Sequence, residues 1–301
     1  MAVTGPAVRQ VAEQVLAAGC TLGEGPVWDR ARACLWFTDI KRPAIHAFEP
    51  ASGRHRTFAV HDQVNWVLPA RNGLLLAGLR DGLHLFDPAL GRCTPLARVP
   101  GEPAGNRLND ACVDSRGRVY FGSMDDGESA ASGRFYRAHG AAIGPHGPDA
   151  ICITNGPAVA PDDLRIYFTD TLGKAILVAD LAADGSVGPL RLFADVARDF
   201  PEAYPDGPVC DAEGCVWTGL WNGWAVARYS PHGELLETVA LPVANVTKLA
   251  FGGPDLTRAY VTTARKGLDA AALAAQPMAG DLFAFDAKVP GVAPALAEVG
   301  A

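Results

Sequence analysis

The sequence predicts an all-β fold, a six-bladed β-propeller with about four antiparallel strands in each blade. Three observations predict it: a strand-like segment recurs six times, each copy has similar neighbours, and turn residues are abundant. Gly and Pro account for 56 of the 301 residues, about 19% against a usual share of roughly 12%. We therefore expect many short strands joined by turns, forming a single domain over residues 1–301.

The recurring segment is a short, aromatic-rich strand. Successive copies lie 40, 44, 47, 50 and 43 residues apart, which is close to the period of propeller blades. The six copies read CLWFTD, LLLAGL, RVYFGS, RIYFTD, CVWTGL and RAYVTT, with their third residues at Trp36, Leu76, Tyr120, Tyr167, Trp217 and Tyr260.

Each copy has a strand before it and another after it. Turns such as those in VWDRARA and CVDSRGR predict a hairpin, because Asp and Gly supply turn geometry. A third strand follows, as in AIHAFEP, GLHLFDP and DLFAFDA, and His46 and His84 at its matching positions are expected to be structural. A radial arrangement protects the exposed strand edges. The amino-terminal strand around Val8 to Val15 is expected to close the ring beside DLFAFDA.

Charge and composition exclude several classes of partner. The formal charge is −7, without a cluster of Lys and Arg, so nucleic acid is not an expected partner. No apolar stretch is long enough to span a membrane, and the amino terminus lacks a secretory signal, which predicts a cytoplasmic protein. Seven cysteines occur without CxxC or another metal-binding spacing, so most are expected to be buried hydrophobic residues. No protein partner or nucleotide cofactor is implied.

Polar residues recur at one position of the repeat. The first strand of a blade lies nearest the propeller axis, so equivalent residues entering these strands gather in one ring. In the second blade this position falls on Asn65 or Trp66. In the other blades, counting back 11 or 12 residues from the aromatic anchors leads to Glu24, Asn109, Asn155, Asp206 and Lys248.

Such a ring predicts a bound cation. Two carboxylates and two amide oxygens in one polar cavity would repel each other and be costly to desolvate without positive charge. Oxygen ligands favour Ca²⁺, Mg²⁺ or Mn²⁺ over a structural zinc ion. We expect one divalent cation, Ca²⁺ by ligand type, with Zn²⁺, Mn²⁺, Mg²⁺ or Fe²⁺ as alternatives. The alternative reading is that these are turn residues, since Asn and Asp are common before Gly.

Five ordered motifs carry a resemblance to a known family. They are LGEGPVW, NRLNDACVDSRGRVYFGSM, ITNGPAVAPDDLRIYFTDT, YPDGPVCDAEGCVW and FGGPDLTRAYVTTA. With them the chain resembles the gluconolactonase, senescence-marker-protein (regucalcin) and luciferin-regenerating-enzyme-like family of six-bladed propeller sugar lactonases. The forms ICITNGP and NVTK are most similar to bacterial aldonolactonases, which tilts the expected substrate toward pentonolactones such as xylono- or arabinonolactone over gluconolactone.

The resemblance implies roles for individual residues. By position, the metal ligands of the family fall on Glu24, Asn155 and Asp206, and its substrate-binding Arg and Asn fall on Arg107 and Asn109. An acidic residue after the GSM segment also touches substrate in some members, and here that residue is Glu128 or Asp126.

Further roles follow from side-chain chemistry. Asp206 is expected to ligate the cation and to accept a proton from the attacking water, as the catalytic base. Lys248 either takes part in substrate binding or proton donation, or only balances the carboxylates. Trp66 and Trp221 either form an apolar wall over the sugar or pack in the hydrophobic core. Arg107 either binds substrate or joins two blades by a salt bridge.

These residues together predict metal-dependent hydrolysis of an aldono-1,4- or 1,5-lactone to the aldonic acid. Two alternatives stay open. One is a binding protein without catalysis, because fold does not determine function. The other is a metal-dependent esterase or phosphotriesterase, because an accessible cation polarises other acyl or phosphoryl oxygens equally well.

Overall fold

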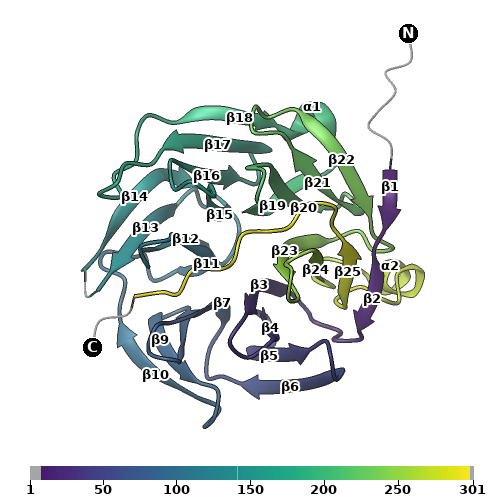
Figure 1. The fold of residues 1–301 in the computed structure, drawn as a ribbon, viewed down its shortest axis with the longest axis horizontal. Helices are drawn as coiled ribbons and strands as arrows, with labels where there is room; N and C mark the ends of the chain where they lie inside the picture. The colour runs from purple at the N-terminus through teal and green to yellow at the C-terminus, as the bar shows by residue number, and fades with distance from the viewer. Residues whose placement is uncertain (1–7, 141, 299–301) are drawn as a thin grey trace.

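Six β-sheets surround a central axis (Figure 1) in the computed structural model of the chain, which describes residues 8–140 and 142–298. Within each sheet, strands that are consecutive in sequence pair antiparallel. From the axis outward, the first three blades consist of β3 (Gly23–Asp29), β4 (Cys34–Asp39), β5 (Ala44–Glu49) and β6 (Arg54–Ala59); β7 (Val64–Pro69), β8 (Leu75–Leu79), β9 (Gly82–Asp87) and β10 (Arg92–Ala97); and β11 (Asn106–Val113), β12 (Val119–Asp125), β13 (Gly133–His139) and β14 (Ala142–Ile151).

The other three blades continue around the ring, and two short helices, α1 (Val196–Asp199) and α2 (Ala270–Ala275), lie between strands. The predicted six-bladed β-propeller is therefore confirmed. From the axis outward, these blades consist of β15 (Thr154–Val159), β16 (Arg165–Asp170), β17 (Ala175–Asp180) and β18 (Arg191–Asp195); β19 (Tyr204–Cys210), β20 (Val216–Trp221), β21 (Ala225–Tyr229), β22 (Leu235–Ala240) and β1 (Val8–Val11); and β23 (Val246–Gly252), β24 (Arg258–Thr263), β25 (Leu282–Asp286) and β2 (Glu13–Leu16).

The aromatic residue of the repeat is tied to the turn that precedes it. Trp36 Nε1 donates to Asp29 Oδ2 at 3.3 Å, and Trp217 Nε1 donates to Asp211 Oδ2 at 2.9 Å. Burying these rings contributes to the core, and each indole N–H keeps a partner. The spacing between turn Asp and aromatic residue is therefore a structural part of the repeat.

The hydrophobic core lies between neighbouring sheets. The rings of Trp36 and Phe86 join the first and second blades with centroids 6.1 Å apart, and those of Trp217 and Phe251 join the fifth and sixth at 6.0 Å. Each blade buries apolar side chains against the next one, so removing a blade would expose two apolar faces.

The amino terminus closes the ring, with one difference from the expectation. β2 pairs with β25 and completes the last blade, as predicted. β1 instead pairs parallel with β22 on the outer edge of the fifth blade. The chain passes between the two sheets at Ala12, which is buried and donates its N–H to Ala240 O at 2.9 Å. The segment from Val8 to Val15 therefore joins two blades.

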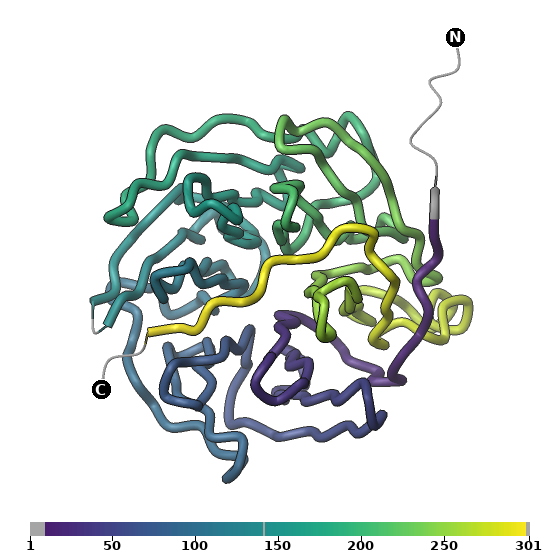
Figure 2. Tube along the Cα trace, in the orientation of Figure 1, coloured from purple at the N-terminus to yellow at the C-terminus, as the bar shows by residue number. Residues whose placement is uncertain are grey.

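The carboxyl-terminal segment runs across the middle of the ring, as the yellow trace in Figure 2 shows. Gly291 bridges to Asp211, and Ala297 bridges to Ala70 on the other side. Ala297 is fully buried. The segment from Ala287 to Glu298, here called the tail, covers one end of the central channel.

Two further statements concern the chain as a whole. The expected single domain over residues 1–301 includes residues 1–7, 141 and 299–301, which lie outside the described residues. Within the described residues, neither helix has the length and apolar character that crossing a membrane would require.

Candidate active site

The ring of polar residues is built from irregularities in the inner strands. The pairing register of β3 shifts between Glu24 and Val27, that of β15 between Asn155 and Ala158, and that of β19 between Pro205 and Pro208. β11 shifts between Leu108 and Ala111. A bulge leaves residues unpaired and redirects their side chains, so the repeated bulge explains why these polar residues face the axis.

Glycine is required at two of these bulges. Gly25 has a φ of +54°, a conformation that residues with side chains rarely adopt. At Gly207, an added Cβ would lie 2.6 Å from Lys248 Cδ, so only glycine allows this close approach. The GEGP and PDGP motifs thus set the backbone around Glu24 and Asp206.

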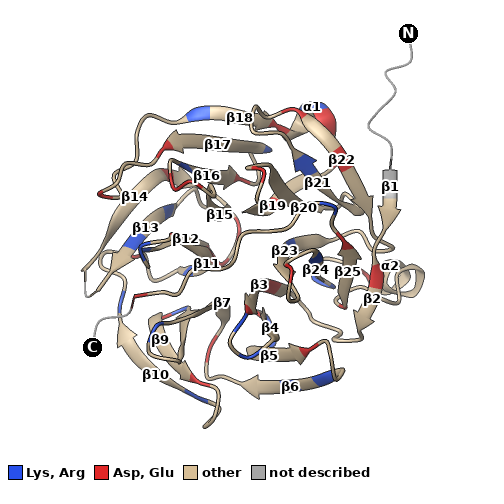
Figure 3. Cartoon of the chain, viewed as in Figure 1, with Lys and Arg blue, Asp and Glu red and all other residues tan. Residues whose placement is uncertain are grey.

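Most of the predicted site residues line one pocket at the end of the channel opposite the tail, here called the axial pocket. Glu24, Arg107, Asn109, Asn155 and Asp206 are all at least nine-tenths buried, yet each faces this pocket. Figure 3 shows acidic and basic residues over the whole ring, with several near its centre. The other lining residues are Leu22, Glu128, Ile153, Thr171, Leu172, Tyr204, Trp221 and Lys266.

A chain of hydrogen bonds orients the amides. Arg107 Nη1 donates to Asn109 Oδ1 at 2.5 Å, and Asn109 Nδ2 donates to Asn155 Oδ1 at 2.9 Å and to Thr154 O at 2.5 Å. Asn155 Nδ2 donates at 2.9 Å to Thr171 Oγ1. Both N–H groups of Asn109 are thus used inside the protein, while Asn155 Oδ1 keeps one lone pair for a ligand.

The hydroxyl of Thr171 settles which way Asn155 points. Thr171 Oγ1 donates to Pro205 O at 2.9 Å, so its single proton is used there. It therefore has only acceptor capacity left for Asn155, which must present its N–H₂ to Thr171 and its oxygen to the axial pocket.

Glu24 and Asp206, the two carboxylates of the ring, are buried and form no ion pair within the described residues. Burial, together with the nearby Asp110 carboxylate, raises the pKa of Glu24 to about 8. Burial raises the pKa of Asp206 well above its usual value, with Glu24 and Asp110 adding to the effect. Asp206 Oδ1 is buried without a hydrogen-bond partner in the described structure. The unpartnered Asp206 Oδ1 and the remaining lone pair of Asn155 Oδ1 are suited to a hard divalent cation.

Lys248 lies beneath this ring and outside the axial pocket. Its Nζ is 2.5 Å from Asp110 Oδ1, and both side chains are buried. Asp110 also accepts from the backbone N–H of Ala111 and of Gly156. This arrangement favours a charge-balancing role for Lys248 over substrate binding or proton donation. The carboxylate that it balances is Asp110 rather than the two ring carboxylates. Asp110 was not singled out from the sequence, but it belongs to the NRLND motif.

Trp66 also lies outside the axial pocket. Its side chain is 1% exposed and packs against Gly78, where an added Cβ would lie 2.2 Å from the indole. The bulge in β7 places Asn65 at the ring position instead, and Asn65 Oδ1 accepts from Arg107 Nη1 at 3.2 Å. The tryptophan on the pocket wall is Trp221.

The two acidic residues expected to touch substrate after the GSM segment lie in different places. Glu128 lines the axial pocket and pairs with Lys266. Asp126 lies behind Arg107, with Oδ1 3.2 Å from Arg107 Nε and 2.5 Å from Lys41 Nζ. Asp126 therefore holds Arg107 in place, and Glu128 faces the pocket.

Lys266 and Tyr204 are pocket residues that sequence reasoning missed. Lys266 Nζ lies 6.0 Å from the centre of the Trp221 ring. Lys266 belongs to a segment between strands that has no counterpart in the repeat, so its place could not be found by counting. Tyr204 begins the YPDGP motif, two residues before Asp206, which was the available signal.

Comparison with protein families decides the classification. The family model described as the SMP-30/Gluconolactonase/LRE-like region matches residues 22–265, which include all six inner strands. The chain belongs to this family. The predicted resemblance is therefore confirmed.

Several relatives match this chain over nearly their whole length. A 6-deoxy-6-sulfogluconolactonase of Pseudomonas putida is 31% identical over 90% of this chain and 93% of the relative. An L-arabinolactonase of Azospirillum brasilense is 34% identical, with 91% of each chain covered. The crystal structure of a calcium-binding protein, regucalcin, from Agrobacterium tumefaciens superposes with a TM-score of 0.91 at 30% identity, covering 95% of this chain and 97% of that one.

Proposed function

We propose that the chain is a sugar lactonase, which hydrolyses an aldono-1,4- or 1,5-lactone to the aldonic acid. The observation that carries the proposal is the axial pocket, where buried carboxylate and amide oxygens face an opening that also holds donors for hydroxyl groups. The names of the two lactonase relatives support the same reaction.

We assign Glu24, Asn155 and Asp206 as the ligands of one divalent cation. The unpartnered Asp206 Oδ1 and the raised pKa values of both carboxylates support this assignment. Oxygen ligation favours Ca²⁺, in agreement with the calcium-binding regucalcin of Agrobacterium tumefaciens. Zn²⁺, Mn²⁺, Mg²⁺ and Fe²⁺ are the alternatives to test. A bound divalent cation would polarise the lactone carbonyl as a Lewis acid.

Asp206 is the proposed catalytic base. Besides contributing to the cation site, its carboxylate takes a proton from a water molecule while the water oxygen forms a bond to the lactone carbonyl carbon. The bond between that carbon and the ring oxygen then breaks, and the proton passes to the ring oxygen, which becomes a hydroxyl. The product is the open-chain aldonic acid, so water is the only co-reactant required.

Arg107 is the proposed donor to the substrate. Its Nη1 is occupied by Asn65, Leu108 O and Asn109, whereas Nη2 has no hydrogen-bond partner in residues 8–140 and 142–298. Nη2 is therefore available for a sugar hydroxyl or for the carboxylate of the product. Asn109 keeps one acceptor lone pair for substrate and otherwise positions Arg107 and Asn155.

Glu128 and Trp221 form the proposed sugar-binding wall, with Leu22, Ile153 and Leu172 as its apolar part. We propose a pentonolactone such as arabinono- or xylonolactone as the preferred substrate over gluconolactone. The 34% identical L-arabinolactonase supports this preference, and the sulfogluconolactonase defines the competing six-carbon class.

The test is acid release from a panel of pentono- and hexonolactones of both ring sizes, with spontaneous ring opening subtracted. The untagged protein is stripped of metal and resupplied with Ca²⁺, Mn²⁺, Mg²⁺, Zn²⁺ or Fe²⁺. We expect turnover that depends on the metal and is fastest with a pentonolactone. Aryl esters and a phosphotriester are included as controls.

Each of the other outcomes has a clear meaning. Preference for the ester or the phosphotriester would replace the lactonase proposal. Equal rates with and without metal would overturn the assignment of a catalytic cation. A folded protein that hydrolyses none of these compounds would favour a binding function.

A further inference from the structure

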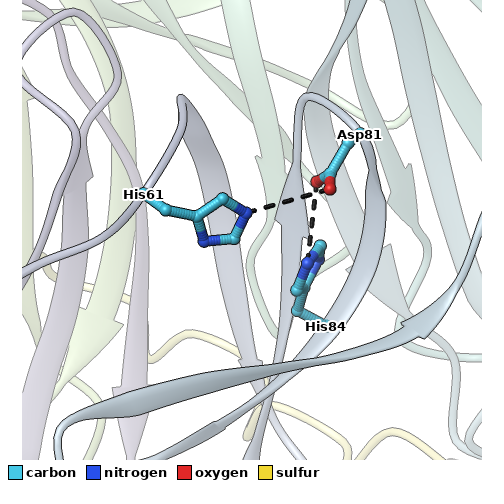
Figure 4. A group of neighbouring side chains, drawn as sticks. All are labelled: His61, Asp81 and His84. Atoms are coloured by element: carbon cyan, nitrogen blue, oxygen red, sulfur yellow. Dashed lines mark ion pairs between the residues drawn. The ribbon is translucent and has the colours of Figure 1, made fainter.

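A second group of potential metal ligands lies away from the axial pocket, on the outer part of the second blade. His61 lies in the loop between β6 and β7, Asp81 lies in the turn between β8 and β9, and His84 is on β9. One ligand atom from each of these side chains lies within 4.8 Å of the other two. Figure 4 shows both imidazole rings directed toward the Asp81 carboxylate.

The distances leave a gap in place of direct hydrogen bonds. His61 Nε2 is 3.8 Å from Asp81 Oδ2, and His84 Nε2 is 3.6 Å from Asp81 Oδ1. An N–H···O hydrogen bond is about 2.7–3.2 Å long. Around tetrahedral zinc, with ligands at about 2.0–2.2 Å, neighbouring ligand atoms are about 3.4 Å apart. The two His–Asp distances are thus within a few tenths of an ångström of the spacing around zinc, and all three ligand atoms lie within 4.8 Å of one another.

His84 provides the decisive observation. Its side chain is 2% exposed, and its Nε2 has no hydrogen-bond partner in the described structure. The other ring nitrogen, Nδ1, is 3.3 Å from the carbonyl oxygen of Gly82, to which it can donate only when protonated. That contact favours the tautomer with a lone pair on Nε2, and histidine ligands of metals are commonly oriented in this way by a carbonyl oxygen.

The surroundings leave the Asp81 carboxylate available. The guanidinium of the adjacent Arg80 turns away to Asp126, with Nη1 3.8 Å from Oδ2. The backbone N–H of Arg80 donates to Gln63 O at 2.9 Å, which ties the turn that carries Asp81 to the loop that carries His61. The two segments are therefore held together before any ion binds.

We propose that His61 Nε2, Asp81 and His84 Nε2 bind a transition-metal ion of the zinc class, with water completing its coordination. Two imidazoles and one carboxylate favour Zn²⁺ and related ions over Ca²⁺, which prefers oxygen ligands. The half-exposed His61 and Asp81 give the ion access from solvent. This site is separate from the axial pocket, and it joins the loop between the first two blades to the β8–β9 turn.

The test is a Zn²⁺ titration of the untagged, metal-stripped chain, followed by calorimetry and by NMR of the histidine ring protons. The chain has seven histidines. We expect Zn²⁺ to shift two of their signals: that of His61, which is missing from the spectrum of His61→Gln, and one further signal, that of His84. Because even a change outside the ligand shell weakens metal binding roughly 10–100-fold, His61→Gln should weaken this binding event by at least about 10-fold.

Three matched variants make the result decisive. His232→Gln removes another exposed histidine and should leave binding unchanged. Asp206→Asn removes an axial carboxylate and should also preserve the two histidine shifts. Asp81→Asn replaces the second exposed ligand and avoids the risk that a His84 variant fails to fold. The proposal is overturned if Zn²⁺ shifts neither histidine, or if His61→Gln and Asp81→Asn bind Zn²⁺ as tightly as the wild type.

Discussion

The two ends of the central channel are made by the same six inner strands, yet they differ in chemistry. Just before the bulges or within them, the strands present Glu24, Asn155 and Asp206 to the axial pocket. After the bulges, the same strands present mainly apolar residues such as Val27 and Val209 to a second pocket, which the tail covers. The bulge thus divides each inner strand into a part free to bind a ligand and a part that packs.

The largest expected effect belongs to the axial end. Asp206→Asn removes the base and one charged ligand while keeping the shape of the side chain. We expect lactone turnover to fall about 10²–10⁴-fold, the usual contribution of general-base catalysis, or further through loss of the cation. Steady-state kinetics and circular dichroism measure the change in rate and the retention of fold. Glu234→Gln, on the exposed surface of the fifth blade, is the control. Turnover near the wild-type rate would refute the assignment of the base.

The next prediction concerns Lys248, at the boundary between the two ends. Lys248→Met leaves the Asp110 carboxylate buried without its partner, and breaking a buried pair in this way costs about 3–5 kcal/mol. Urea unfolding measures this loss. Adding Asp110→Asn should recover part of it, because the two side chains interact directly. If Lys248→Met keeps its stability but loses turnover, Lys248 acts in the reaction after all.

The third prediction uses the raised pKa of Glu24. Its pKa is about 8 in the folded protein and about 4.5 in the unfolded chain. Between these values the folded state binds more protons than the unfolded state, so stability falls as the pH rises. We expect metal-free wild-type protein to lose stability between pH 4.5 and about 8 relative to Glu24→Gln.

Denaturant unfolding at several pH values in the presence of a chelator measures this difference. A saturating divalent cation should reduce it, because the cation takes the place of the proton at the carboxylate. Parallel pH profiles of the wild type and Glu24→Gln would show that the Glu24 carboxylate is compensated by other means.

The fold could be predicted because each blade repeats a local pattern. The strand recurs in every blade, and in several blades a turn Asp holds its aromatic residue, as Asp29 holds Trp36 and Asp211 holds Trp217. Counting from these anchors also brought Glu24, Asn155 and Asp206 to one pocket, because the bulges occupy equivalent places in the repeat.

Features that depend on contacts distant in sequence were not predictable in this way. Lys248 precedes the aromatic anchor of its blade by about the same number of residues as the other ring positions, which suggested a place in the ring. The bulge in β23 and the charge of Asp110 instead place its ammonium group beneath the ring. The tail has no repeat, so nothing local indicated that Ala297 would cross the ring and pair with Ala70. Parallel pairing of β1 with the fifth blade is likewise decided by the free edge of β22.

The fourth prediction tests the tail end by itself. Ala297→Leu adds volume at a fully buried position, and overpacking of this kind costs about 1–3 kcal/mol. We expect lower stability in urea unfolding with unchanged kcat/KM, because the tail lies at the end opposite the axial pocket. Ala293→Leu, at an exposed position of the tail, is the control and should change stability by less than about 0.5 kcal/mol. A loss of kcat/KM in Ala297→Leu would mean that the two ends are coupled.

The smallest expected effect is at the rim of the axial pocket. Glu128 and Lys266 form an ion pair in which about a third of each side chain is exposed, so Glu128→Gln should change stability by less than about 1 kcal/mol. Glu128 belongs to the proposed sugar-binding wall rather than to the proposed cation site, so its loss should raise KM and leave kcat nearly unchanged. Lys266→Met removes the other member of the pair and separates loss of the ion pair from loss of the Glu128 contact with substrate. If Glu128→Gln lowered kcat as strongly as Asp206→Asn, Glu128 would belong with the reacting groups, and the division between a catalytic ring and a binding rim would be wrong.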